Sequence, residues 1–205
     1  MARADEIALI APGVYFWQAY APAVKADLCS CALATPRGLF LVDPISLKPE
    51  ALCRMTADYE IAGVVVTNEN HERTALQYAR EFRVPIFADP AVPEADTWPR
   101  TQPLSTAGLD CPGLAAVSLP GAPAGETALH YSENGGTLVI GDAVINLQPY
   151  GFVPLPAKYC PDDRLMRQSL KNLLHYRFER ILFAHGTPIV ANAHSRLEQL
   201  LASGS

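Results

Sequence analysis

The chain has 205 residues, of which 49% are hydrophobic and 18% are charged, and its net charge is −5. This composition supplies a large core, and it excludes a chain that is disordered over most of its length. The mildly acidic balance and the lack of a long basic run argue against nucleic acid or an anionic membrane surface as the main partner. We therefore expect a small molecule or a protein as the partner.

The first part of the chain predicts a meander of short strands followed by alternating helices and strands. Strand formers and turn residues delimit the meander, and helical spacing of apolar side chains marks the helices. The β-branched run between the two helices is too apolar for a surface strand and predicts a buried one. In chain order the predicted elements are strands at 13–17, 28–35 and 39–42, a helix at 49–59, a strand at 61–66, a helix at 74–82 and a strand at 86–88.

A proline-rich stretch at 89–103 can hold neither a helix nor a central strand, so it is predicted to be an irregular excursion. Strands and helices resume beyond it, and a second stretch rich in Pro and Gly interrupts them at 148–161. The order of elements predicts two sheets sandwiched between helices. The later elements are strands at 114–119, 127–131 and 137–140, a helix at 164–175, a strand at 180–184 and a helix at 192–202.

The cysteines and the N-terminal residues bear on the compartment. The five cysteines form no C-x-x-C spacing, which argues against a secreted disulfide framework. Cys29 and Cys31 lie two apart on a predicted strand and are expected to be small core residues on one face. The N-terminus lacks the pattern of a secretion signal, and no apolar run of about 18 residues occurs. We expect a cytoplasmic protein.

Short motifs lie where the apolar strands give way to loops, which is where ligand sites form in such architectures. The motifs occupy 64–74, 119–127, 139–142 and 183–186, with the strand end 41–44 ahead of them. In order and spacing they resemble the metallo-β-lactamase-fold hydrolases, especially the glyoxalase II-like branch, over almost the whole chain. The resemblance implies an α+β fold, a four-layer αββα sandwich, formed as one domain over 1–205.

The metal site of that family rests on a T-H-x-H-x-D-H motif, a histidine in P-G-H-T-P-G, an aspartate after a glycine and a late histidine before a glycine. Aligned on Thr67, this chain has Asn68 and Asn70 at the first two histidine positions and Ala122 at the third. An amide oxygen is a much weaker zinc ligand than an imidazole, and alanine donates nothing. The resemblance therefore implies that the three-histidine site is lost.

The second site of the family is altered rather than lost. Glu72 stands for the aspartate, Asp142 and His185 are retained, and Arg73 replaces a histidine. Two carboxylates and one imidazole suit a single Mn, Fe, Mg or Zn ion. We expect Arg73, which is always charged, to take the place of the ion and to hydrogen-bond to Glu72 or Asp142.

Three further readings accompany this alignment. Asp142 and His185 are alternatively structural residues that hydrogen-bond across the sheet ends. His71 lies inside the first motif but one position out of register, so its side chain is expected to point away from Asn68 and Asn70. Cys160 lies in a loop that overhangs the pocket by resemblance, and it has no base nearby in the sequence to activate it.

The leading hypothesis is a member that keeps the pocket but lacks dinuclear zinc chemistry, binds no metal and is non-catalytic or reprogrammed to bind a small ligand or a protein. The alternative is a hydrolase of ester- or thioester-like substrates that uses one metal ion at Glu72, Asp142 and His185. A third hypothesis makes this face an assembly surface. The oligomeric state is not predicted. The residues assigned to the former metal site are Asn68, Asn70, His71, Glu72, Arg73, Ala122, Asp142 and His185.

Overall fold

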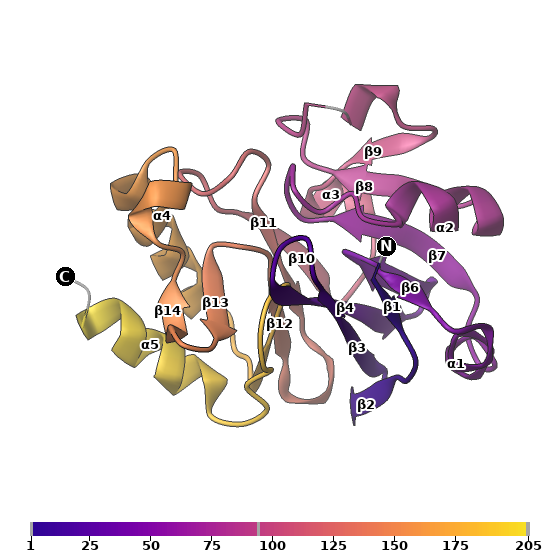
Figure 1. The fold of residues 1–205 in the computed structure, drawn as a ribbon, viewed down its shortest axis with the longest axis horizontal. Coiled ribbons are helices and arrows are strands. Elements are labelled where there is room, and N and C mark those ends of the chain that lie inside the picture. Colours follow the sequence, from indigo (N-terminus) through magenta and orange to yellow (C-terminus); the bar gives the residue numbers. More distant parts are fainter. Residues whose placement is uncertain (1, 94, 204–205) are drawn as a thin grey trace.

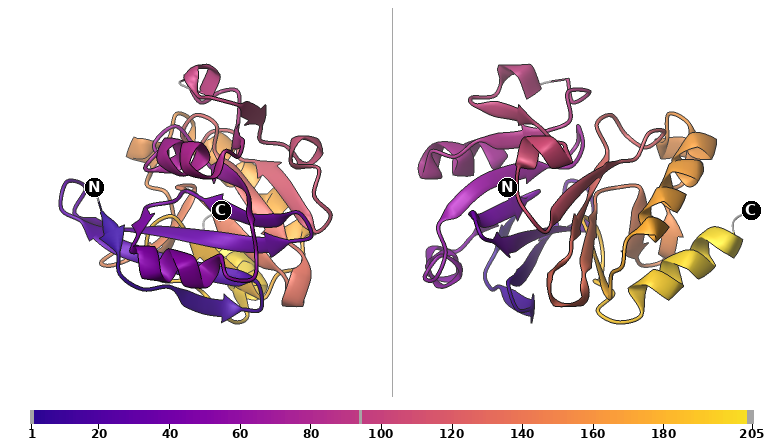
Figure 2. Two further views of the ribbon diagram at one scale, coloured as in Figure 1. Left: turned by 90° about the vertical axis from the view of Figure 1, so that its right-hand side faces the viewer. Right: turned by 180° about the vertical axis from the view of Figure 1, so that it is seen from behind.

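The protein, seen in a computed structural model that describes residues 2–93 and 95–203, forms four layers (Figure 1). Two sheets lie face to face, and helices cover the outer face of each (Figures 1 and 2). The predicted αββα sandwich is therefore confirmed. The helices are α1 (Pro49–Met55) and α2 (Ala75–Phe82) on the first sheet, α4 (Asp163–Leu170) and α5 (Ala193–Ser203) on the second, and the short α3 (Thr106–Leu109).

The first sheet has seven strands in the order β2-β3-β4-β5-β7-β8-β9. The strands from β2 to β5 form an antiparallel meander, whereas β5, β7, β8 and β9 run parallel. Parallel strands require crossover connections. Helix α1 lies in the crossover from β5 to β7 and α2 in that from β7 to β8, whereas a 3-10 turn at Ala95–Thr97 lies in the crossover from β8 to β9. The strands are β2 (Ala8–Ala11), β3 (Val14–Ala21), β4 (Ala26–Thr35), β5 (Gly38–Val42), β7 (Ile61–Val66), β8 (Ile86–Ala88) and β9 (Thr101–Pro103).

The second sheet has four strands in the order β10-β11-β12-β15, and its last two strands are parallel. Two smaller pairs flank the sheets: β1 with β6, and β13 with β14. The strands are β10 (Leu114–Ser118), β11 (Thr127–Tyr131), β12 (Thr137–Ile140), β15 (Arg180–Phe183), β1 (Arg3–Ala4), β6 (Ser46–Leu47), β13 (Val144–Leu147) and β14 (Gly151–Pro154).

Three apolar clusters hold the layers together. One joins α1 and α2 to the first sheet, and one joins α4 and α5 to the second. The third lies between the sheets and contains Cys29 and Cys31, which are free, buried and on one face of β4 as expected. Burial of this apolar surface is the main source of stability.

The helices and loops depart from the predicted bounds in ways that follow from local sequence. The first helix ends at Met55, four residues early, and the helix that begins at Asp163 continues as a 3-10 helix over Lys171–His175. The proline-rich stretch supplies β9, an edge strand, where proline is tolerated. Among the described residues no helix is long and apolar enough to cross a membrane.

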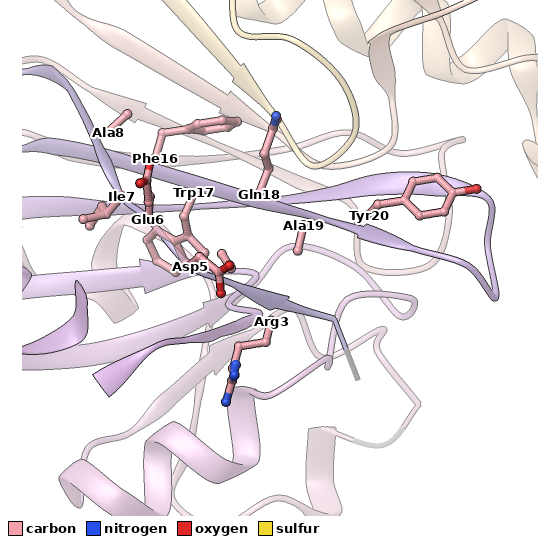
Figure 3. Close-up of a pocket in the computed structure, with 11 residues that line it drawn as sticks. Arg3, Asp5, Glu6, Ile7, Ala8, Phe16, Trp17, Gln18, Ala19 and Tyr20 are labelled. Carbon is pink, nitrogen blue, oxygen red and sulfur yellow. The ribbon is translucent and has the colours of Figure 1, made fainter. Parts of the chain in front are cut away.

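A cavity of about 670 Å³ runs along β3 and the segment that leads into β2 (Figure 3). In Figure 3, Phe16 and Gln18 project to one side of β3, and Trp17 projects to the other. The residues lining this cavity all fall between Arg3 and Tyr20. It is therefore separate from the residues that the sequence assigned to a site.

Candidate metal centre

Three side chains with metal-ligating atoms meet at the ends of strands from both sheets. His71 follows β7, Asp142 follows β12 and His185 follows β15. One ligand atom from each lies within 4.8 Å of the others. The Oδ1 atom of Asp142 lies 3.3 Å from Nε2 of His71 and 3.5 Å from Nε2 of His185. Parallel neighbouring strands place their carboxyl ends at one sheet edge, and this explains why distant residues meet here.

The other nitrogen of each imidazole is held by an acceptor. Nδ1 of His71 lies 2.9 Å from Oδ2 of Asp43, and Nδ1 of His185 lies 3.1 Å from the main-chain oxygen of Asp27. A carbonyl oxygen only accepts, so His185 carries its proton on Nδ1 and presents the lone pair of Nε2 to Asp142. Metal-binding histidines are oriented by hydrogen bonds of this kind.

The carboxylate of Asp43, which contacts His71, is itself fixed by two hydrogen bonds from Thr67. Its Oδ1 accepts the main-chain N–H of Thr67 at 2.8 Å, and its Oδ2 accepts the Thr67 hydroxyl at 2.5 Å. Burial opposes the charge of Asp43, but His71 and then Arg73 hold the pKa of this carboxyl below its usual range. Asp43 is therefore an ionised acceptor that fixes the imidazole of His71.

The two histidines have opposite protonation tendencies. Burial alone would lower the pKa of His71, but the carboxylates of Asp142 and Asp43 raise it to about 9. Burial lowers the pKa of His185, and the nearby cations His71 and Arg73 lower it further against the effect of Asp142. Without a metal ion, His185 is thus neutral at pH 7 and His71 is a cation that balances two carboxylates. An ion that binds Nε2 of His71 must therefore displace the proton on that nitrogen.

These atoms fit a divalent metal ion. Ligand atoms around a tetrahedral zinc ion with bonds of about 2.1 Å lie roughly 3.4 Å apart, close to the 3.3 and 3.5 Å that separate Asp142 Oδ1 from the two nitrogens. Within the described residues, Nε2 of His71 is the one buried side-chain polar atom that makes no hydrogen bond. Because the lone pair of His185 faces a carboxylate oxygen, a metal ion that displaces the Nε2 proton of His71 would satisfy all three groups.

A second polar cluster lies beside Asp142. The Nδ2 atom of Asn68 donates to Oε2 of Glu126 at 2.6 Å and to Oδ2 of Asp142 at 3.1 Å. Oε1 of Glu126 accepts the main-chain N–H of Ala143 at 3.0 Å. Burial, followed by the charge of Asp142, raises the pKa of Glu126 to about 7. Asn68 thereby ties two acidic groups together.

Arg73 points into the molecule, but its hydrogen bonds differ from those predicted. Its guanidinium donates to the main-chain oxygens of Cys29 at 2.5 Å, Asp43 at 2.9 Å and Ala184 at 3.3 Å. The prediction of hydrogen bonds to Glu72 or Asp142 is therefore wrong. Arg73 sits in a left-handed conformation with φ of 44°, which turns its side chain beneath the strand ends.

Asp142 and His185 lie close together, as the alternative hypothesis required, but the third residue near them is His71 and not the proposed Glu72. Within the described residues the candidate group contains His71 and not Glu72. Glu72 is half-buried and lines a separate cavity of about 390 Å³ with Leu76 and Arg80. The prediction for Glu72 as a member of this group is wrong because the loop does not continue the alternation of the strand.

His71 turns inward because the chain bends after β7. The main-chain N–H of His71 donates to the oxygen of Asn68 at 3.1 Å, which closes a turn. The side chains of His71 and Asn68 both contact Asp142, so the expectation that His71 points away from Asn68 is wrong. Asn70 is exposed and donates its main-chain N–H to Oδ1 of Asn68, and Ala122 packs in the apolar cluster beneath α4.

The structure also adds Asp43 and Glu126 to the site and argues against a reactive role for Cys160. Asp43 and Glu126 were not among the predicted site residues. Asp43 follows a buried strand that pairs with the strand before the first motif, and this position could have identified it as a site residue. Glu126 gave no such signal, because its burial depends on tertiary packing. Burial raises the pKa of Cys160, whose Sγ lies near main-chain oxygens and Met166, so it is not an activated thiol in this state.

Comparisons with known proteins agree with this architecture. The sequence model of the metallo-beta-lactamase superfamily matches residues 7–204, whereas no curated protein matches the chain. A metallo-beta-lactamase from Erythrobacter litoralis is 16% identical, with a TM-score of 0.73 and 96% of each chain covered. One from Pontibacter korlensis is 16% identical, with a TM-score of 0.72 and 96% and 98% covered. The DIM-1 metallo-beta-lactamase is 15% identical, with a TM-score of 0.72 and 98% and 100% covered. On the strength of the family match over nearly its whole length, the chain belongs to the metallo-β-lactamase superfamily.

Proposed function

We propose that the protein is a mononuclear metal-dependent hydrolase that holds one divalent ion through His71, Asp142 and His185. The observation that carries this proposal is the arrangement of two imidazoles around Oδ1 of Asp142. Two imidazole Nε2 atoms approach it at 3.3 and 3.5 Å, and both imidazoles are held through Nδ1. Such an arrangement supports a ligand set with the outer hydrogen bonds already in place.

Two imidazoles and one carboxylate suit zinc, iron or manganese and leave room for a further ligand. When bound, such an ion supplies a Lewis acid and lowers the pKa of water toward about 7. The protein's own residues provide the rest: Asp43 holds the tautomer of His71, the main chain of Asp27 orients His185, and Asp142 carries the negative charge. Ester- or thioester-like compounds are the proposed substrate class.

A non-catalytic binding protein is the second candidate, and one observation favours it. Asn68 and Glu126 form a closed hydrogen-bonded pair next to Asp142, and His71 is already a cation between Asp43 and Asp142. Because each buried charge in this cluster already has a partner, no ion is needed to compensate an unpaired charge. In this case the pocket would bind an organic ligand or a protein without hydrolysis.

Equilibrium dialysis against Zn²⁺, with elemental analysis of the protein, tests the leading proposal. Wild type should retain about one ion per chain. His71→Gln removes a ligand and should weaken binding by more than the roughly 10- to 100-fold that loss of an outer hydrogen bond costs. Glu72→Gln is the matched control and should bind as wild type does. Equal binding by wild type and His71→Gln, or no binding by wild type, would overturn the proposal.

Hydrolysis of a set of nitrophenyl esters and acyl thioesters separates the two candidates. Activity that rises with ion occupancy and vanishes in His71→Gln supports the hydrolase. One bound ion per chain with no turnover of any substrate in the set would instead favour the binding protein.

A further inference from the structure

We infer that Asn68 and Glu126 are positioning residues that restrict Asp142 to one ligand oxygen. This inference rests on the proposed metal centre, and it concerns the part of the site where family ligands are missing. The side chain of Asn68 stands at the first of the lost histidine positions, and it contacts Asp142 directly.

The orientation of the Asn68 amide is fixed by its neighbours. Its Oδ1 accepts the main-chain N–H of Asn70 at 2.8 Å, while its Nδ2 donates to Glu126 and Asp142. A flipped amide would place an oxygen against two acidic groups and an NH₂ group against an N–H, losing all three hydrogen bonds. The donor side of Asn68 therefore always faces Asp142.

Glu126 is held just as firmly. It is 2% exposed and accepts from both Asn68 Nδ2 and the main-chain N–H of Ala143. A Cβ atom added at Gly141 would lie 2.8 and 2.9 Å from the two Glu126 oxygens and 2.7 Å from the Thr67 hydroxyl. A side chain at position 141 would clash with the carboxylate, so this glycine leaves the space in which Glu126 lies beside Asn68.

We call the two hydrogen bonds from Asn68 to Glu126 and Asp142 the bridge. The bridge gives the two oxygens of Asp142 different roles. Oδ2 accepts from Asn68, so Oδ1 remains for the two imidazoles. A carboxylate held in this way offers one oxygen to an ion rather than two. A low coordination number favours Zn²⁺, whereas Mn²⁺ prefers more oxygen ligands. The hydrogen bonds that join Asn68 to Glu126 and Asp142 therefore favour a four-coordinate ion.

The visible absorption of bound Co²⁺ reports coordination number without any need for activity. Wild type should give the strong absorption of four-coordinate Co²⁺, and Asn68→Ala should give a weaker spectrum because Oδ2 of Asp142 is released. The preference for Zn²⁺ over Mn²⁺, measured by competition dialysis, should fall by about 10-fold, the size of effect typical of outer hydrogen bonds. Asn70→Ala, which removes a neighbouring exposed amide, is the control and should match wild type.

Asn68→Ser and Glu126→Gln test the bridge with smaller disturbances, and their thermal unfolding shows whether they fold. Both should shift the spectrum and the preference in the same direction as Asn68→Ala. Folded variants with the spectrum and preference of Asn70→Ala would overturn the inference while leaving the metal centre intact. Failure of wild type to bind Co²⁺ or Zn²⁺ would overturn the metal centre itself, and the inference with it.

Discussion

At the scale of single residues, the tautomer of His71 decides whether the site can hold an ion. The carboxylate of Asp43 accepts a hydrogen bond from Nδ1 of His71, and two hydrogen bonds from Thr67 fix this carboxylate. Nε2 is then the nitrogen left to face Asp142. A carboxylate in this position also increases the basicity of the imidazole, which strengthens it as a ligand.

We predict that Asp43→Asn lowers the affinity for Zn²⁺ by about 10- to 100-fold, because the imidazole of His71 loses its ionised partner while every ligand remains. Isothermal titration calorimetry measures the change. Asp27→Asn is the control, since Asp27 contacts His185 through its main-chain oxygen only in the described hydrogen bonds. Unaltered affinity in a folded Asp43→Asn protein would remove Asp43 from the metal centre.

Asp142 and His185 lie close together, as the alignment led us to expect, and each lies two residues beyond the end of a buried strand. Sequence reasoning misjudged His71 and Glu72 because strand alternation was extended into a loop. The main chain turns at Asn68 and brings His71 inward. The hydrogen-bonding partners of Arg73 could not be predicted from the sequence either, since they are main-chain atoms from three separate segments.

At the scale of elements, the site depends on two parallel strand pairs, one in each sheet. β5 and β7 deliver Asp43 and the loop with His71, and β12 and β15 deliver Asp142 and His185. Periodicity predicted these strands well because their apolar runs are buried on both faces. It missed β14, which lies within the segment rich in Pro and Gly, and β13, which pairs with β14.

Arg73 connects these strand ends, and we predict that Arg73→Met lowers the free energy of unfolding by about 2–4 kcal/mol. The change leaves the main-chain oxygens of Cys29, Asp43 and Ala184 without the donor that they share. Chemical denaturation measures the loss. Arg80→Met, on the exposed side of α2, should change stability by no more than about 0.5 kcal/mol. A stability loss no larger than that of the control would contradict the connecting role.

At the scale of the whole molecule, a buried acid makes stability depend on pH. Glu126 faces Asp142, His71 and Asn68, and its pKa of about 7 in the folded chain lies above the ordinary 4.5. The folded state therefore binds this proton more tightly than the unfolded state does. The resulting contribution to stability is fully present below pH 4.5 and is lost as the pH rises through about 7.

We therefore predict that the metal-free wild type loses stability relative to Glu126→Gln between about pH 4.5 and 8. Urea denaturation at a series of pH values gives the difference directly. The exposed Glu133→Gln variant should show the same pH profile as wild type. A constant difference between wild type and Glu126→Gln across this range would show that Glu126 titrates as an ordinary carboxyl group.

The position of a bound ion tests the central claim most directly. Crystals of the full chain grown with Zn²⁺ should be measured on both sides of the zinc absorption edge, so that anomalous differences locate the ion. The account predicts one peak per chain, within bonding distance of His71, Asp142 and His185 and away from Glu72. A protein that takes up no zinc, a peak coordinated by Glu72, or two peaks per chain would contradict it.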